Sequence, residues 1–408
     1  MSIIVQKYGG SSVADVQKIG IVADRVVAAK REGHDVVVVV SAMGKTTDGL
    51  IELAKRAAEA EGAGAEPPRR ELDMLVSTGE RVTMALLSIA IHARGHDAIS
   101  FTGSQSGILT NDRHFDARII EVRPHRILDE LHRGRIVIVA GYQGMSYKRE
   151  ITTLGRGGSD TTAVALAAAL SAERCEIYSD VDGVYSADPR VVSDPKHLPE
   201  MDLSVLGEMA EAGAKVLNAQ AVEWARRSKI VIHARRTSDP LTGARQTAAR
   251  PDPEDGEIAR SADENRNVRA IVGIGNVMFA RIARASLPQF LATAAGEEVS
   301  VGDVVATGED ALVHLPLLNM PDWPRCKRAI ETALGSGATF LGTRAVVSVV
   351  GYGLTGASAA LARALEALAR AEVVPQCIAA GPLRISATID EAQLDRAQRA
   401  LHDAFVDA

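Results

Sequence analysis

Short aliphatic runs alternate with longer helical patterns through the first 235 residues, and this order constrains the fold more than any other feature of the chain. The aliphatic runs are continuous, which is typical of strands buried on both faces of a parallel sheet. The expected strands are 3–6, 35–41, 98–102, 136–141, 175–179 and 230–233, and the expected helices are 13–31, 50–61, 70–94, 161–171 and 203–228. Regular alternation of strand and helix predicts an α/β fold, with a mostly parallel sheet covered by helices on both faces.

The composition changes near residue 242, where a second part of the chain begins. Residues 242–266 contain Pro251, Pro253 and a cluster of acids with little apolar periodicity, which is typical of a linker. Beyond it we expect strands at 268–274, 345–350 and 383–389 and helices at 287–295, 324–334, 358–371 and 393–405. The predicted boundaries are a large α/β domain over 1–243, a linker over 244–266, and two small α/β modules over 267–342 and 343–408.

Composition excludes several classes of function. With 46 Lys plus Arg against 52 Asp plus Glu, the net charge is −6, so the chain lacks the basic surface that a nucleic-acid binder needs. Its three cysteines, Cys175, Cys326 and Cys377, are far apart and show no C-x-x-C spacing, which fits neither a disulfide scaffold nor a zinc site. No residue is expected to be a metal ligand.

The N-terminal segment has no signal-peptide pattern, and the most apolar run, 36–40, is far shorter than the roughly 20 residues that span a bilayer. We therefore expect a cytoplasmic protein that binds neither a membrane nor nucleic acid.

A glycine turn follows the first expected strand. It reads Lys7-Tyr8-Gly9-Gly10-Ser11-Ser12 and precedes a helix. Two glycines allow close backbone approach to a phosphate, the helix N-terminus favours an anion, and Lys7 supplies a full positive charge. Because the lysine precedes the glycines, the turn is not a Walker A loop. Taken alone, it is also explained by a tight turn with a solvated lysine.

A second glycine-rich segment reads Leu154-Gly155-Arg156-Gly157-Gly158-Ser159-Asp160 and opens an alanine-rich helix. The forked guanidinium of Arg156 can hold a carboxylate through two hydrogen bonds, while Ser159 and Asp160 stand at the helix start, where a phosphate binds well. An N-capped helix after a flexible loop is the alternative interpretation. Packing alone, however, does not explain an arginine between glycines.

Three further segments follow expected strands or open expected helices. Tyr178-Ser179-Asp180-Val181-Asp182-Gly183-Val184-Tyr185 continues to Arg190 and has turn chemistry that suits a nucleotide base and ribose, although a solvated loop would look similar. Glu80 lies within a helical pattern, where a surface glutamate is equally reasonable. The segment from Ser41 to Thr47 lies at the carboxyl end of a strand, where open α/β sheets bind ligands.

Together and in this order, these segments resemble the aspartate kinases of the amino acid kinase superfamily from residue 3 to about residue 240. Gly213-Ala214-Lys215-Val216-Leu217 matches a further family element, whereas Asn218-Ala219 replaces the His-Pro of many members. The resemblance implies an amino acid kinase fold followed by two C-terminal ACT-like modules. It also implies transfer of phosphate from ATP, with Mg²⁺, to the side-chain carboxylate of L-aspartate, giving 4-phospho-L-aspartate for lysine, threonine and methionine biosynthesis or for a dedicated pathway.

The resemblance also assigns roles to individual residues. Lys7 would stabilise the transferring phosphoryl group, and Asp160 would orient Lys7. Arg156 would bind the substrate carboxylate, and Glu80 would receive its α-ammonium group. The substrate-binding residues would be Ser41, Thr47, Glu80, Arg156, Gly157, Gly158 and Ser159. The ATP site would be lined by Lys7, Gly9, Gly10, Ser179, Asp180, Tyr185, Arg190 and Lys215.

One segment in the C-terminal part imitates a dinucleotide-binding motif. Gly351-Tyr352-Gly353-Leu354-Thr355-Gly356 satisfies G-x-G-x-x-G after a strand and before a helix. We reject that interpretation because no acid ends the next expected strand and too few residues follow for a Rossmann domain. The resemblance explains the segment as the start of the last ACT-like module.

The resemblance weakens at the effector-binding turns of the ACT-like modules. The first module shows Arg284-Ala285-Ser286-Leu287-Pro288 where the family has Asp-x-Pro-Gly, and the second shows Ala379-Ala380-Gly381-Pro382 where the family has a strand edge rich in serine and threonine. We therefore expect weak or absent inhibition by lysine and threonine. ACT modules commonly pair edge to edge, so the resemblance also implies a homodimer or a higher homo-oligomer.

Two other functions compete with this one. Another acyl-phosphate-forming kinase, acting on glutamate or an N-acyl amino acid, would share the glycine motifs, although Arg156 and Glu80 favour free aspartate. A non-catalytic amino-acid sensor would keep its effector turns and lose its catalytic residues. Here Lys7 and Asp160 are present while the effector turns are altered, which favours catalysis.

Overall fold

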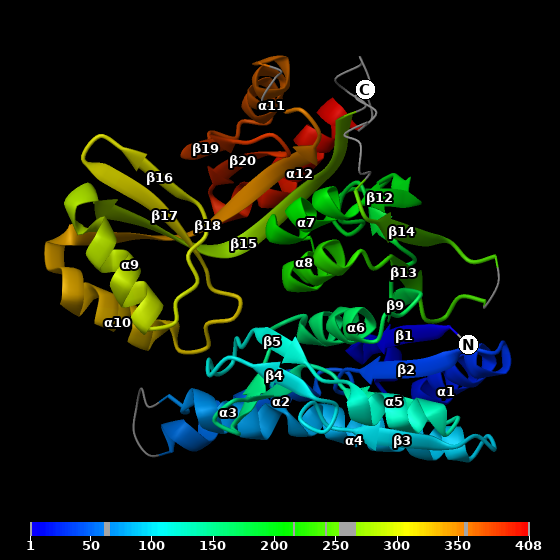
Figure 1. Cartoon of the computed structure of the whole chain (residues 1–408). Helices are drawn as coiled ribbons and strands as arrows, with labels where there is room; N and C mark the ends of the chain where they lie inside the picture. Colours follow the sequence, from blue (N-terminus) through cyan, green and yellow to red (C-terminus); the bar gives the residue numbers. More distant parts are fainter. Residues whose placement is uncertain are drawn as a thin grey trace. The chain divides into compact units, whose positions relative to one another are not determined.

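The computed structural model describes residues 2–60, 66–214, 217–240, 243–252, 267–354 and 358–406 (Figure 1). Contacts divide the chain into two compact units. The first comprises Met1–Val184, His197–Gly207 and Lys215–Asp252, and the second comprises Tyr185–Lys196, Glu208–Ala214 and Pro253–Ala408. Lys215 and residues 253–266 of the predicted linker lie outside the described residues.

An eight-stranded sheet forms the centre of the first unit. Its order is β12 (Glu200–Asp202), β14 (Gln246–Arg250), β13 (Ile232–Arg236), β9 (Arg174–Ser179), β1 (Ile3–Tyr8), β2 (Asp35–Val40), β6 (Ile136–Ala140) and β3 (Ala98–Phe101). Every neighbouring pair is parallel except β13 with β14. This confirms the predicted α/β class.

The strands are apolar throughout because both faces of the sheet are covered. On one face, Val36, Val38 and Val40 of β2 pack in a core with helices α1 (Val16–Arg31) and α4 (Thr78–His92). On the other face, α6 (Gly158–Ala169) lies against β1, β2 and β9, and α8 (Ala219–Ser228) packs on α6. Nearly every residue of α6 is buried, as expected for a helix that is apolar all round.

Several elements of the first unit were not predicted. A small four-stranded sheet has the order β5 (Ile119–Val122), β4 (Ile108–Thr110), β7 (Gln143–Ser146) and β8 (Ile151–Thr153). The sequence also did not predict α5 (His125–His132), the strands β12 and β14 of the large sheet, or a two-stranded pair, β10 (Val184–Tyr185) with β11 (His197–Leu198).

The remaining helices are α2 (Thr46–Glu59), α3 (Arg69–Val76) and α7 (Leu203–Glu211). The predicted single helix over 203–228 is wrong, since α7 and α8 are separate and Gly213 between them has a φ of +104°.

Residues Arg69–His92, which form α3 and α4, are long and apolar enough to cross a membrane by length and composition alone. In this fold they have a different explanation. Leu87 and Ile91 of α4 are fully buried in the core beneath the large sheet. The core helix of a globular domain carries apolar residues of this kind, so length and composition alone do not identify this segment as a membrane span.

The second unit is built on an antiparallel sheet of six strands. Its order is β16 (Val304–Thr307), β17 (Asp310–Pro316), β15 (Val268–Ala283), β18 (Ala338–Gly351), β20 (Arg384–Ile389) and β19 (Cys377–Ala380). Its helices are α9 (Leu287–Gly296), α10 (Trp323–Leu334), α11 (Ser358–Arg370) and α12 (Leu394–Phe405), close to the predicted positions. Both neighbours of β18 run antiparallel to it, which is incompatible with a dinucleotide-binding βαβ unit at Gly351.

Two hydrophobic cores share the long strands β15 and β18. One core contains Val268 and Ile271 of β15 and packs against α11 and α12. The other contains Met278 and Ile282 of β15 and packs against α9 and α10. The predicted module boundary between residues 342 and 343 falls inside β18, and as a domain boundary it stays a prediction.

Candidate active site

Four parallel strands of the first unit end side by side and carry most of the predicted site. Backbone hydrogen bonds join these ends. Gly9 donates to the carbonyl of Tyr178 at 3.1 Å, Ser41 donates to Tyr8 at 3.1 Å, and Gly141 donates to Val40 at 3.0 Å. The turns that follow β1, β2, β6 and β9 therefore meet at one edge of the sheet, the edge at which open α/β sheets bind ligands.

A buried ion pair lies at this edge. Lys7 Nζ is 2.7 Å from Asp160 Oδ1, and the two side chains are only 11% and 9% exposed. Lys7 is at the end of β1, and Asp160 is in the first turn of α6, where a carboxylate is favoured by the helix dipole. A Cβ atom on Gly9 would sit 3.4 Å from Lys7 Nζ, so glycine leaves room beside the ammonium group.

The glycine turn packs closely on the turn after β2. A Cβ atom on Gly10 would lie 3.0 Å from the carbonyl oxygens of both Ala42 and Gly44, and the amide of Gly44 donates to Gly10 at 3.0 Å. This contact explains the second glycine by close backbone approach. Ser41 and Thr47, at the two ends of the neighbouring turn, are half-buried.

Glu80 is a buried carboxylate in the first turn of α4. Its side chain is 3% exposed, and its Oε1 atom accepts a hydrogen bond from the amide of Ala42 at 3.1 Å. Oε2 is buried and has no hydrogen-bond partner among the described residues. Burial raises the pKa of Glu80 to about 7, against the lowering effect of backbone hydrogen bonds. The surface glutamate that sequence alone also allowed is thereby excluded.

The arginine loop is fixed by its glycines and by Asn218. Gly157 has a φ of +77°, and a Cβ atom on it would sit 2.9 Å from the Asn218 Cβ. Asn218 Nδ2 donates to the carbonyl of Arg156 at 2.8 Å, while its Oδ1 accepts from the amide of Gln220 and caps α8. The asparagine that departs from the family pattern therefore both caps a helix and holds this loop.

The Arg156 side chain extends into solvent. It is 61% exposed and makes a 3.4 Å ion pair with the equally exposed Asp48. Exposed pairs of this kind contribute little to stability, so the guanidinium can change partners at low cost. Ser159, by contrast, is buried, and a Cβ atom on Gly141 would lie 2.7 Å from its Oγ atom.

Tyr142 is a site residue that sequence reasoning missed. It follows Gly141 at the end of β6, has a φ of +69° and is 7% exposed. A Cβ atom on Gly158 would lie 3.2 Å from its ring. Burial raises the pKa of Tyr142, the negative charge of Glu80 raises it further, and the positive charge of Arg156 lowers it. Its place directly after an apolar strand was the only signal for it in the sequence.

The predicted nucleotide-binding residues are distributed over both units. Ser179 ends β9, and its Oγ atom accepts a hydrogen bond from the amide of Val181 at 3.2 Å, while Asp180 is exposed. Tyr185 and Arg190 belong to the second unit, in which Arg190 is paired with Asp188 at 2.7 Å. Lys215 lies outside the described residues, so the structure does not test its predicted role.

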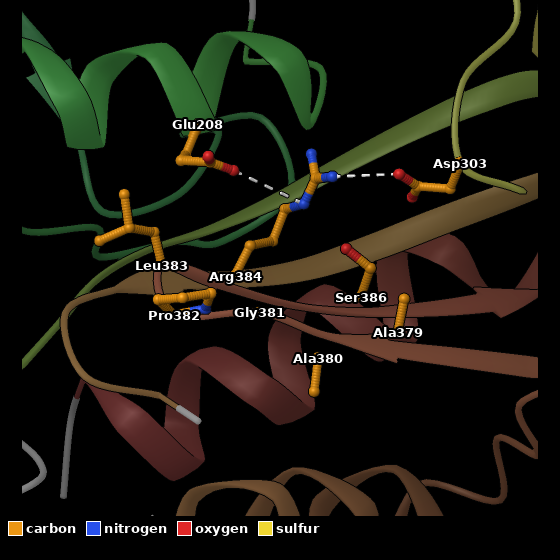
Figure 2. Close-up of a pocket in the computed structure, with 9 residues that line it drawn as sticks. All are labelled: Glu208, Asp303, Ala379, Ala380, Gly381, Pro382, Leu383, Arg384 and Ser386. Carbon is orange, nitrogen blue, oxygen red and sulfur yellow. Dashed lines mark hydrogen bonds and ion pairs between the residues drawn. The ribbon is translucent and has the colours of Figure 1, made fainter. Parts of the chain in front are cut away.

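A pocket of about 430 Å³ lies in the second unit and is shown in Figure 2. The hairpin between β19 and β20 supplies its wall with Ala379, Ala380, Gly381, Pro382 and Leu383, and the polar residues are Glu208, Asp303, Arg384 and Ser386. Arg384 lies between two carboxylates, 3.8 Å from Glu208 and 3.4 Å from Asp303. The Ser386 hydroxyl is bonded to that of Ser348 at 2.9 Å.

Comparison with known proteins identifies the family to which this fold belongs. The amino acid kinase family profile matches residues 2–235, and an ACT domain profile matches residues 347–405. The aspartokinase of Mycolicibacterium smegmatis is 41% identical over 99% of this chain and 96% of its own length. The aspartokinase of Corynebacterium glutamicum is 40% identical with the same coverage.

A solved structure, Escherichia coli aspartokinase III in complex with aspartate and ADP, has the same fold. Its TM-score is 0.84 at 24% identity, over 98% of this chain and 99% of that one. Fold, sequence similarity and full-length coverage point to one family. The chain therefore belongs to the aspartokinases of the amino acid kinase family.

Proposed function

We propose that this aspartate kinase transfers the γ-phosphate of ATP to the side-chain carboxylate of L-aspartate and releases 4-phospho-L-aspartate and ADP. The observation that carries the proposal is the buried pair of Lys7 and Asp160, 2.7 Å apart, beside the glycine turn at the sheet edge. The related E. coli enzyme was solved with aspartate and ADP, which supports these two kinds of ligand.

The chemistry of the reaction determines what the site must supply. A carboxylate with a reference pKa of ~3.9 is already ionised at neutral pH, so the nucleophile needs no general base. The barrier is electrostatic, because an anionic nucleophile must approach an anionic phosphate. Positioning and charge neutralisation therefore supply most of the rate in phosphoryl transfer.

Lys7 is the residue that we assign to the transferring phosphoryl group. Its partner Asp160 holds the ammonium group in place at the helix N-terminus, so that the charge is oriented before the substrate arrives. MgATP is the substrate form, and the ion contributes charge neutralisation at the phosphate oxygens. The amides near Gly9 and Gly10 approach the phosphates, and Ser179 and Asp180 of the same unit extend the nucleotide site. For Tyr185, Arg190 and Lys215 a nucleotide-binding role stays a prediction.

Aspartate is recognised in this proposal by two opposite charges. Arg156 receives a substrate carboxylate, and the unsatisfied Oε2 of Glu80 receives the α-ammonium group. Ser41, Thr47, Gly157, Gly158 and Ser159 complete the pocket. A buried carboxylate with one unpaired oxygen is costly unless a cation satisfies it, which supports a substrate with a free amino group over an N-acyl amino acid.

The test is an assay that traps the acyl phosphate. Purified enzyme with MgATP and hydroxylamine forms aspartyl hydroxamate and ADP in equal amounts if the proposal is right. Glutamate and N-acetylglutamate are the comparison substrates. If either has a higher kcat/KM than aspartate, that compound and not aspartate is the substrate. If the wild-type protein phosphorylates none of the three compounds, the non-catalytic amino-acid sensor is favoured instead.

The contribution of Lys7 is measured in the same assay with the K7A variant. Removal of a preorganised charge at the reacting centre lowers kcat by about 10²–10³-fold. The matched control is K55A, which removes an exposed lysine of α2 and leaves kcat unchanged. Because K7A leaves the buried Asp160 without its cation, circular dichroism is used to verify folding. A folded K7A variant with wild-type kcat would remove Lys7 from the mechanism.

We further propose that feedback inhibition by lysine and threonine is weak. The hairpin wall of the pocket in the second unit presents alanine, glycine, proline and leucine, which offer no side-chain hydrogen bonds. Its guanidinium and its serine hydroxyl are already paired with protein groups. An amino-acid effector there must therefore break existing pairs before it gains new ones.

We also propose a homo-oligomer, at least a dimer, formed through the ACT-like part of the chain. The outer strands of the six-stranded sheet are β16 and β19, and a strand edge is a template for pairing with another chain.

A further inference from the structure

Asp73 is a fully buried carboxylate that the proposed reaction does not use. It lies on α3, is 0% exposed, and accepts three hydrogen bonds. Its Oδ1 accepts from the amide of Phe115 at 3.0 Å and from the hydroxyl of Thr153 at 2.5 Å, and its Oδ2 is 2.6 Å from His114 Nδ1. The carboxylate thus joins three segments that are distant in the sequence: helix α3, the loop at residues 114–115 and strand β8.

The side chain and the backbone of Thr153 are both held in place. Thr153 has one hydroxyl hydrogen, and it is donated to Asp73. The carbonyl of Thr153 accepts a hydrogen bond from the amide of Ala117 at 2.8 Å. Asp73 therefore anchors the last residue of β8.

Tyr142 contacts the arginine loop from a neighbouring segment. The ring of Tyr142 lies next to Gly158, and the backbone carbonyl of Tyr142 accepts from the amide of Leu154 at 2.9 Å. Thr153 itself directly precedes the loop that carries Arg156. The positive φ of Tyr142, +69°, is unfavourable for a bulky residue and persists only where surrounding contacts hold it.

We propose that Asp73 is a positioning residue for aspartate binding, which fixes the loop 154–158 by holding the hydroxyl of Thr153 directly before that loop. The inference rests on the proposed function, because the loop it positions carries Arg156. Neither Asp73 nor Thr153 touches the reacting atoms in this proposal. Their effect is on the aspartate side of the site and not on the nucleotide side.

The decisive comparison uses two adjacent threonines of β8. T153V removes the hydroxyl that Asp73 binds and keeps the side-chain shape. T152V removes an equally buried hydroxyl whose partner is Thr110, 2.6 Å away in the same small sheet. T153V raises KM for aspartate by about tenfold, the cost of one lost buried hydrogen bond, with KM for ATP within twofold. T152V leaves both constants within twofold of wild type.

Rescue of the KM for aspartate and retention of folding are measured on the same group of variants. T153S restores the hydroxyl and returns KM for aspartate to within threefold of wild type. D73A raises the same KM, because alanine offers no acceptor for the Thr153 hydroxyl. Thermal unfolding is recorded for every variant. If T152V and T153V lose the same Tm, a KM change found only in T153V comes from positioning of the loop and not from lower stability.

If T152V and T153V change KM equally, or if T153V does not change KM, the inference is overturned and the proposed function is unaffected. Failure of the wild type to phosphorylate aspartate overturns the proposed function first.

Discussion

At the scale of single residues, Glu80 shows how burial prepares a charge for its ligand. The helix α4 places the carboxylate beneath the turn after β2, where one oxygen is satisfied by a backbone amide and the other is not. Burial raises the pKa of this group to about 7, so ionisation competes with protonation at physiological pH. Only the ionised form attracts the α-ammonium group of aspartate.

This gives a prediction for the pH dependence of aspartate use. A raised carboxyl pKa means that the protonated, inactive form dominates below about pH 7. The value of kcat/KM for aspartate therefore rises roughly tenfold per pH unit below that point and flattens above it, since kcat/KM reports groups of the free enzyme. The E80Q variant loses this rising limb together with most of its aspartate affinity. A flat wild-type profile between pH 5.5 and 8.5 would contradict the assignment.

Asn218 and Tyr142 illustrate which roles of single residues could not be predicted from the sequence. The pattern singled it out as a departure from the family without a role, and the structure assigns it two hydrogen bonds that hold the arginine loop and cap α8. Tyr142 was missed for a different reason. Its importance rests on a backbone angle and on contacts between distant segments, neither of which leaves a periodic or compositional signal.

At the scale of elements, the long strands and helices were predictable and the short strands were not. Continuous valine in β2 and the alanine-rich α6 are typical of buried parallel sheet and buried helix, and both were found near their predicted bounds. The strands β4 and β8 have three residues each, too few for any alternation to be recognised. They matter to function because β8 leads directly into the arginine loop.

The arginine loop makes a prediction about its glycines. G157A introduces a methyl group at a φ of +77° and within 2.9 Å of Asn218, whereas G134A meets the same backbone strain at +78° with no atom within 4 Å. Each substitution costs about 1–2 kcal/mol of unfolding free energy through the backbone alone. Only G157A also raises KM for aspartate, because the loop must move away from Asn218.

Urea unfolding and steady-state kinetics of this pair separate the two effects. Equal KM values for G157A and G134A would show that the contact with Asn218 does not set the loop position.

At the scale of the whole molecule, the regulatory prediction is the clearest departure from the family. In the presence of millimolar lysine plus threonine, the rate of ADP release falls by less than about twofold, since the paired groups in the pocket leave little to bind an effector. The control is the same mixture added to an enzyme that lysine is known to inhibit. Complete loss of activity with lysine plus threonine would refute weak feedback.

The oligomeric state is a separate prediction at the same scale. Light scattering coupled to size exclusion gives at least twice the 43.1 kDa of one chain. Val304 and Ile378 lie on the outer strands β16 and β19 and are 41% and 38% exposed. The double variant V304K/I378K places a charge on each strand edge, so we expect it to lower the measured mass toward that of one chain. L318K, at a 59% exposed residue outside the strands, keeps the wild-type mass. A wild-type mass of one chain at micromolar concentration would contradict the assembly.

The two cores of the second unit have a consequence for how this protein can be altered. Because β15 contributes Ile271 to one core and Ile282 to the other, a chain cut after residue 342 keeps the core of Ile282 but separates Ile271 from the rest of its own core. A gene shortened at that point would leave half of β15 without its neighbouring strand and an apolar face without its helices. Changes to this part of the chain are therefore best made by point substitution within an intact chain, and recombination between relatives is expected to succeed when residues 268–406 are exchanged as one block.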